Sequence, residues 1–430
     1  MKNIKPAFFL RRSIRYDQLV DFAIILFSLY AFSRGSLGLA IPFSFWALLV
    51  ALIIGLLIIF FVGKGKASRT RNTFFMLYVL CMILFWNNQD FQHGIFADAY
   101  FYATVLLIGI AVDSSKKNND RLLNILIWSG IFYAFWTILS ALIPAVYDQF
   151  ILPTLRKFAP DTPRGNYMCG FTTHYSTNGM YLANGVIASI AKLYTQKRYG
   201  KISRKSVMAL IVLSVGLLFC GKRGIFLCVL ASFCMMFVLG RRGKGRVAKL
   251  MVFLAALSIA VYIASFWISP LMTIIQRFQT QISTGDISTG RFDIWAEAWE
   301  GFTSSPLFGH GWGWFRYNNT FGTDFHAHNC YLQWLCELGV LFSIPLFIMV
   351  GWNYYRSVKR CRSLNAGSDN VSADTQIYQM SVFSFMYQTY FLLFALEGTA
   401  FYEIQTVFIY FVCIVSVNKI ISGQKRKAYA

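Results

Sequence analysis

Charged residues are scarce in this sequence of 430 residues. Only 13% are charged, against about 25% in a typical soluble domain, while 57% are hydrophobic and 18% aromatic. Such a chain has too little polar surface for a soluble enzyme, and its hydrophobicity excludes a disordered protein. The charge falls in short islands between apolar runs rather than on one polar face, which argues against a nucleic-acid partner. We therefore expect an integral membrane protein in contact with membrane lipid.

Long apolar runs take up most of the chain, and a run of about 20 residues is enough to cross a bilayer as a helix. The hydropathy predicts twelve spans, at about 18–34, 39–63, 73–88, 95–113, 122–144, 176–194, 205–221, 224–240, 248–269, 331–352, 376–396 and 402–421. The fold expected is an all-α polytopic membrane protein forming a single membrane domain over 1–430. We expect no cleavable signal peptide, because the first apolar run leads directly into the second without a cleavage site.

Basic residues outnumber acidic ones by 40 to 18, a formal net charge of +22. Cytoplasmic loops of membrane proteins retain Lys and Arg. With twelve spans and the N-terminus inside, 31 of the 40 basic residues fall on the inner side and 9 on the outer side. This asymmetry predicts that both termini are cytoplasmic and that most of the positive charge anchors the topology.

The longest predicted outer connection runs over about 270–330, between the ninth and tenth spans. Within it, Phe292, Trp295, Trp299 and Phe302 recur at helical spacing and form one apolar stripe. Such a stripe predicts either an interfacial helix, where Trp is favoured, or ordinary packing against the bundle. We expect this outer loop to carry the chemistry.

Histidine is rare, and all five residues map to the predicted outer side: His93, His174, His310, His326 and His328. Imidazole titrates nearest neutrality, so candidate proton-transfer groups collect in one compartment. The pair His326-Ala-His328 matches no familiar zinc pattern. Asp324 and Glu337 could complete an improvised site, but we expect no metal.

The nine cysteines mostly fall in apolar spans, where a free thiol behaves as a small hydrophobe. Cys169 and Cys330 are the only pair expected on the outer side, so they are the one candidate disulfide.

Two outer arginines stand out, Arg223 in the short turn Gly221–Gly224 and Arg291 after Thr289-Gly290. The planar guanidinium fork suits a phosphate ligand, because it can hold two oxygens at once. Together with Lys222 they could cradle a diphosphate, and Arg164 and Arg316 are further candidates. The alternative is that Lys222 and Arg223 extend to the lipid headgroups, as cations at helix ends often do.

An ordered series of motifs resembles the superfamily of O-antigen ligases and O-antigen polymerases. The series consists of Lys222-Arg223-Gly224, Gly290-Arg291-x-x-Ile294-Trp295, Pro306-x-x-Gly309-x-Gly311, His328-Asn329 and Glu337-Leu-Gly339. It covers about 110 residues, and the twelve-span layout agrees with it. Lys222 stands where a Ser or Thr often precedes the arginine.

The resemblance implies a periplasmic glycosyltransferase of the bacterial inner membrane whose donor is a glycan on undecaprenyl diphosphate. The acceptor would be a sugar of the lipid A-core in a ligase, or a second lipid-linked repeat in a polymerase. A protein hydroxyl, as in the O-oligosaccharyltransferases, is a third alternative. The spacing favours a ligase.

The resemblance also implies roles for residues. His328, expected to be a neutral imidazole near its ordinary pKa, would be the general base. Arg223, Arg291 and Lys222 would hold the diphosphate in a metal-independent, inverting transfer without a cofactor. His326, Asn329, His174, Arg164 and Arg316 are candidates for the substrate cleft. The run that contains His174 could equally be a capped helix start, and Glu397 and Glu403 are interpreted as solvated loop charges. A lipid-linked-sugar transporter would place charged residues near the bilayer midplane, where this sequence has almost none.

Overall fold

The computed structural model describes residues 25, 28, 31–33, 118–160, 162, 168–200, 202–239, 245–266, 272, 275–276, 279–280, 282–283, 288, 290–322, 325–365, 375–403 and 405–414. The described part of the chain is helical and contains no strand. The predicted spans at 39–63, 73–88 and 95–113, and nearly all of 18–34, lie outside it.

The remaining predicted spans coincide with helices to within about five residues, except that the helix predicted at 331–352 continues to Asn365. These helices are α6 (Asn118–Leu142), α9 (Tyr175–Tyr199), α10 (Arg204–Cys220), α11 (Arg223–Leu239), α12 (Arg246–Ser265), α16 (Cys330–Asn365) and α17 (Thr375–Glu397), followed by a described helix at Gln405–Ile414. Three of these segments are long and apolar enough to cross a membrane by length and composition: Asp120–Leu142, Val247–Ser265 and Cys330–Leu364. The total of twelve spans and the side on which the termini lie stay predictions.

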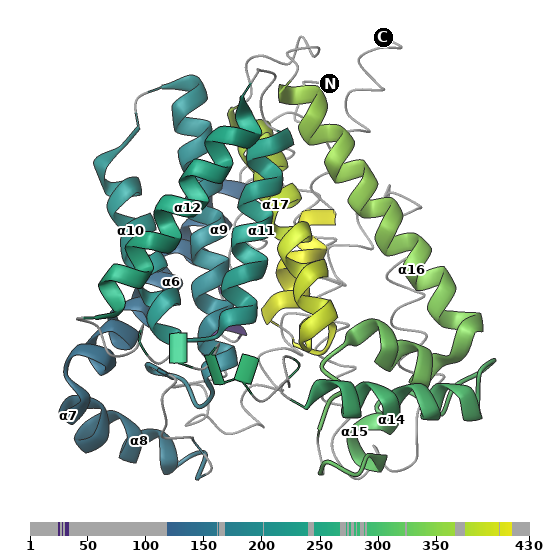
Figure 1. The fold of residues 1–430 in the computed structure, drawn as a ribbon. Helices are drawn as coiled ribbons and strands as arrows, with labels where there is room; N and C mark the ends of the chain where they lie inside the picture. The colour runs from purple at the N-terminus through teal and green to yellow at the C-terminus, as the bar shows by residue number, and fades with distance from the viewer. Residues whose placement is uncertain are drawn as a thin grey trace, which may run out of the picture.

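Helix α9 lies at the centre of the bundle and packs against α6, α10, α11 and α17 (Figure 1). Small residues let α9 and α6 approach closely, as is typical between membrane helices. A Cβ at Gly185 would lie 3.3 Å from the Cα of Gly130 and 3.2 Å from the carbonyl oxygen of Leu126. Helix α12 instead lies at the edge of the bundle, and its residues Met251, Val252 and Ile259 are exposed, as expected for a lipid-facing surface.

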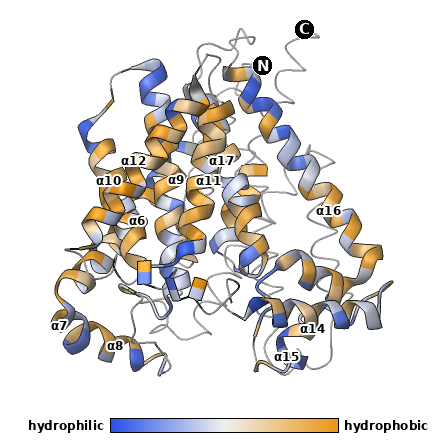
Figure 2. Ribbon diagram, viewed as in Figure 1, coloured by the Kyte–Doolittle hydropathy of each residue, from blue (hydrophilic) through white to orange (hydrophobic). Residues whose placement is uncertain are grey.

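Short helices gather at one end of the bundle: α7 (Pro144–Val146), the π-helical turn Tyr147–Ile151 and α8 (Leu152–Arg156) below α6, and α14 (Arg291–Ser304) with α15 (Trp314–Asn318) below α16. Figure 2 shows that the middles of the long helices are mainly apolar, whereas hydrophilic residues collect at their ends and in the short helices. The segments predicted to be outer connections therefore meet at a single end of the molecule.

The aromatic stripe of α14 combines the two predicted alternatives, packing against the bundle and exposure at the membrane interface. Trp295 and Phe302 pack onto a small core that contains Ile294, Ala298 and Phe315. Phe292 and Trp299 are exposed, at 64% and 52%. One half of the stripe thus attaches the helix to the bundle, and the other half is free to contact the membrane interface.

Candidate functional site

The turn between α10 and α11 presents the first cations of the site. Gly221 ends α10 in the left-handed conformation, with φ 73°, which favours glycine. Its neighbour Lys222 lies against α9, where the Nζ atom is 5.3 Å from the centre of the Tyr175 ring. Burial lowers the pKa of Lys222, and the nearby Glu397 opposes this shift. Lys222 is therefore half-buried within the protein rather than extended into the lipid headgroups.

Arg291 is the first residue of α14, and it forms an ion pair with the last residue of α17. Its Nη1 atom lies 3.0 Å from Oε2 of Glu397, and both side chains are 22% exposed. The Glu397 carboxylate lies directly over Gly224, where an added Cβ would be only 1.9 Å from Oε2. The interpretation of Glu397 as a solvated loop charge is wrong, because the carboxylate is held among the cations.

His328 lies in a loop of unusual backbone geometry just before α16. It has a φ of 51°, which is uncommon for a residue other than glycine and often marks a functional site. The following residue, Asn329, caps α16, and its Oδ1 atom accepts hydrogen bonds from the backbone N–H groups of Tyr331 and Leu332 at 3.2 and 3.1 Å. The carbonyl of this cap is therefore engaged in holding the loop to the helix.

Charge converges on His328 from three other elements. Burial, the positive charges of Lys222 and Arg291, and the neighbouring His174 together lower its pKa to about 4. The expectation of an imidazole near its ordinary pKa is wrong, because sequence spacing shows neither the burial nor the cations. Arg223 interacts electrostatically with Arg291. Residues from α9, α11, α14 and the loop before α16 thus form one basic site.

Two glycine motifs fix the loop segments that frame this site. The N–H groups of His310 and Gly311 donate to the carbonyl oxygens of Cys336 and Glu337 at 3.1 and 2.8 Å. These carbonyls are free because α16 kinks at Gly339, which has φ 63°. A Cβ on Gly309, itself at φ 69°, would lie 2.4 Å from the Glu337 backbone. The contact is backbone against backbone, so a side chain on Gly309 cannot be accommodated.

The family model described as O-antigen ligase matches residues 208–347. The matched segment contains Lys222, Arg223, Arg291 and His328, the residues that the fold brings together. The match supports the resemblance of this segment to the superfamily of O-antigen ligases and O-antigen polymerases. No curated protein matches the sequence.

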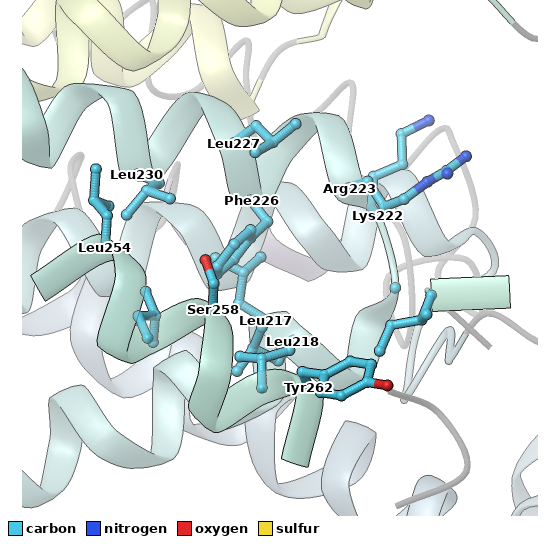
Figure 3. A pocket seen from close by; sticks show the side chains of 14 residues that line it. Leu217, Leu218, Lys222, Arg223, Phe226, Leu227, Leu230, Leu254, Ser258 and Tyr262 are labelled. Atoms are coloured by element: carbon cyan, nitrogen blue, oxygen red, sulfur yellow. The ribbon is translucent and has the colours of Figure 1, made fainter. Parts of the chain in front are cut away.

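The matched family supports activity of the O-antigen ligase or polymerase type on lipid-linked glycans in general, and the long apolar helices of this protein indicate an integral membrane protein. An apolar pocket of about 370 Å³ opens beside its basic site, between α10, α11 and α12 (Figure 3). Lys222 and Arg223 lie at one end of the pocket, and Phe226, Leu230 and Leu254 line its apolar wall. The site therefore joins a cationic region to a hydrocarbon-compatible one.

A chain of hydrogen bonds connects the loop before α16 to the interior of the protein. The Nδ1 atom of His326 lies 3.3 Å from Gln333, whose amide group donates to the buried Glu337 at 2.8 Å. Glu337 also accepts a hydrogen bond from the Tyr402 hydroxyl at 2.9 Å. Burial and the charge of Arg316 lower the pKa of His326 well below its usual value. His326 is thus a neutral support of the loop, and Arg316 lies beside it rather than among the residues that lower the pKa of His328.

Other predicted site residues have different positions. Arg164 and Asp324 lie outside the described residues. Cys169 and Cys330 are both free thiols, and Cys330 donates instead to the Gly398 carbonyl oxygen at 3.3 Å. The predicted disulfide is therefore wrong. In the described part of the chain, no three His, Cys, Asp or Glu side chains gather as metal ligands.

Sequence reasoning misinterpreted Glu397 and missed the hydrogen-bonded chain through Gln333 and Tyr402. Glu397 carried a weak signal, since it is a carboxylate at the outer end of a helix in a chain with few acidic residues. Gln333 and Tyr402 carried none, because their roles depend on contacts between distant segments.

Proposed function

We propose that this protein transfers a glycan from undecaprenyl diphosphate to a sugar hydroxyl of lipid A-core, at the periplasmic face of the bacterial inner membrane. The observation that carries the proposal is that Lys222 and Arg291 lie close enough to His328 to act on its charge, with Arg223 close to Arg291 and an apolar pocket beside them. The family match supports the same class of reaction.

The charge of the site suits a diphosphate diester. The charged groups around Lys222 are Arg223, Arg291 and Glu397, so three cations and one carboxylate give a net charge of +2. A diphosphate diester carries one negative charge on each phosphate, and guanidinium groups bind phosphate oxygens in pairs. Electrostatic complementarity of this kind selects the ligand and fixes its position.

The apolar pocket suits the polyprenyl tail. Its walls come from α10, α11 and α12, and Lys222 and Arg223 lie at one end. A diphosphate held by these cations would place the carrier lipid along the aliphatic and aromatic side chains. Burial of a hydrocarbon chain contributes about 0.8 kcal/mol for each CH₂ group, so even part of the tail adds substantial affinity.

The reaction needs a base and a stabilised leaving group. His328 is neutral above about pH 4, so its imidazole can accept the proton of the acceptor hydroxyl. The hydroxyl oxygen forms a bond to the anomeric carbon as the bond from that carbon to the diphosphate oxygen breaks. The electron pair leaves with the diphosphate, whose charge the cations stabilise. Direct attack opposite the leaving group inverts the anomeric centre.

A repeat-unit polymerase would use the same donor and the same chemistry with another lipid-linked glycan as acceptor. The lipopolysaccharide profile of a deletion strain separates the two functions. A ligase predicts loss of all polymer-capped bands while lipid-linked polymer accumulates, whereas a single capped repeat would identify a polymerase. Complementation with His328→Ala should fail although the variant protein is inserted at the wild-type level. Restoration of a wild-type profile by this variant would refute the proposed role of His328.

A further inference from the structure

His174 begins α9 with one ring nitrogen already in use. Its backbone is extended, with φ −146° and ψ 135°, and its Nδ1 atom accepts a hydrogen bond from the backbone N–H of Ser176 at 3.2 Å. The Thr172 hydroxyl lies 2.9 Å from the His174 carbonyl oxygen, so the residue is fixed from both sides. The predicted helix cap is therefore confirmed, and the imidazole ring itself forms it.

The cap determines which ring nitrogen carries the proton. A backbone N–H can only donate, so Nδ1 must act as the acceptor, and a neutral imidazole then carries its hydrogen on Nε2. Protonation of Nδ1 would break this hydrogen bond, so the cap itself favours the neutral ring, and the positive charge of Lys222 nearby also disfavours the imidazolium. Within the described part of the chain, Nε2 has no hydrogen-bond partner.

The ring stands with the residues of the basic site. It packs against the Tyr175 ring at 4.2 Å between ring centres, and the Nζ atom of Lys222 lies 5.3 Å from that same Tyr175 ring. His174 is also close enough to affect His328 electrostatically. A fixed, uncharged donor therefore lies beside cations that the proposed function assigns to the diphosphate.

We infer that His174 binds the lipid-linked diphosphate by donating a hydrogen bond from Nε2 to a phosphate oxygen. This inference rests on the proposed function. Phosphate oxygens of a diester only accept hydrogen bonds, so a locked donor matches them. The same lock prevents the neutral His174 from removing a proton through Nε2, which leaves the proton transfer to His328. The cations already balance the ligand charge, and a neutral donor adds directionality without further charge.

Two substitutions distinguish a role of His174 in phosphate binding from a role in capping α9 only. His174→Asn keeps a good N-cap residue but has no donor at the position of Nε2. His174→Gln places an amide N–H₂ near that position and is a poor cap. A cap-only role predicts that Asn is tolerated and Gln is harmful. The donor role predicts the reverse order for ligand binding.

The test measures binding of farnesyl diphosphate to the full-length protein in lipid nanodiscs, with farnesol as the uncharged control. A hydrogen bond to a charged acceptor predicts about tenfold weaker binding for His174→Asn, with an unchanged melting temperature, and near wild-type affinity for His174→Gln. The loss in His174→Asn should be the same at low and high salt, whereas Arg291→Gln should change the salt dependence.

Wild-type affinity in His174→Asn would overturn the inference while leaving the proposed function intact, provided that Arg291→Gln weakens binding. If farnesyl diphosphate binds the wild-type protein no better than farnesol, the proposed binding of a diphosphate by the basic site is refuted as well. The two failures are therefore distinguishable.

Discussion

The low pKa of His328 gives a prediction about the pH dependence of transfer. A general base must be neutral to accept a proton, and a histidine of ordinary pKa, about 6.5, loses this ability as the pH falls below that value. Burial, Lys222 and Arg291 hold the pKa of His328 at about 4. The acid limb of kcat/KM, which reports the free enzyme, should therefore lie near pH 4.

Removing a neighbouring cation should move the acid limb of kcat/KM to a higher pH. Among the neighbouring charges, that of Lys222 lowers the pKa of His328 most. Replacing it with Met keeps much of the aliphatic chain and removes the charge, which makes the imidazolium easier to form. The pKa then rises, on the order of one unit, and activity is lost at a higher pH. Arg316→Met is the matched control, because the charge of Arg316 acts on His326.

The assay is the initial rate of glycan transfer by the protein in nanodiscs, with the donor concentration varied at each pH. Bound diphosphate brings negative charge to Lys222 and Arg291, so it should raise the pKa of His328 in the complex. The acid limb of kcat should then lie at a higher pH than that of kcat/KM. A kcat/KM limb near pH 6.5, or an equal shift in Lys222→Met and Arg316→Met, would refute this electrostatic account.

Two further substitutions test contacts at the site. Glu397→Gln removes the carboxylate that neutralises Arg291, so Arg291 becomes available to the donor and the donor KM should fall by about fivefold. An unchanged or higher KM in a steady-state assay would contradict competition between Glu397 and the diphosphate for Arg291. Gly309→Ala forces a Cβ against the Glu337 backbone and should destabilise the protein by about 3 kcal/mol. Gly351→Ala, where a Cβ meets nothing within 4 Å, should melt at or above the wild-type temperature, and equal melting of both variants would contradict the packing argument.

Hydropathy located helices well because the apolar runs are long and their ends are marked by polar or glycine residues. Gly221 ends α10 within a residue of the predicted boundary. The C-terminal extension of α16 to Asn365 was missed, since the last part of that helix is polar. Its kink at Gly339 depends on hydrogen bonds from a distant loop, and hydropathy does not predict contacts of this kind.

The residue types of the site were predictable, but their energetics were not. Arg223, Arg291 and His328 were selected by type and motif, and the fold brings them together. The pKa of His328 depends on burial and on cations more than 30 residues away in the sequence. The ion pair of Arg291 with Glu397 joins residues 106 positions apart in the sequence. The predicted disulfide was wrong for a related reason, because the sequence does not show which distant segments come into contact.

The central claim is that His328 removes the acceptor proton while the basic site holds the lipid diphosphate. The most direct measurement combines single-turnover glycan transfer and donor binding for wild-type protein and His328→Ala in nanodiscs. The account predicts that the variant binds the lipid-linked donor within about twofold of wild type but forms product at least about a hundredfold more slowly. Transfer at a rate close to wild type, with donor binding intact, would contradict it.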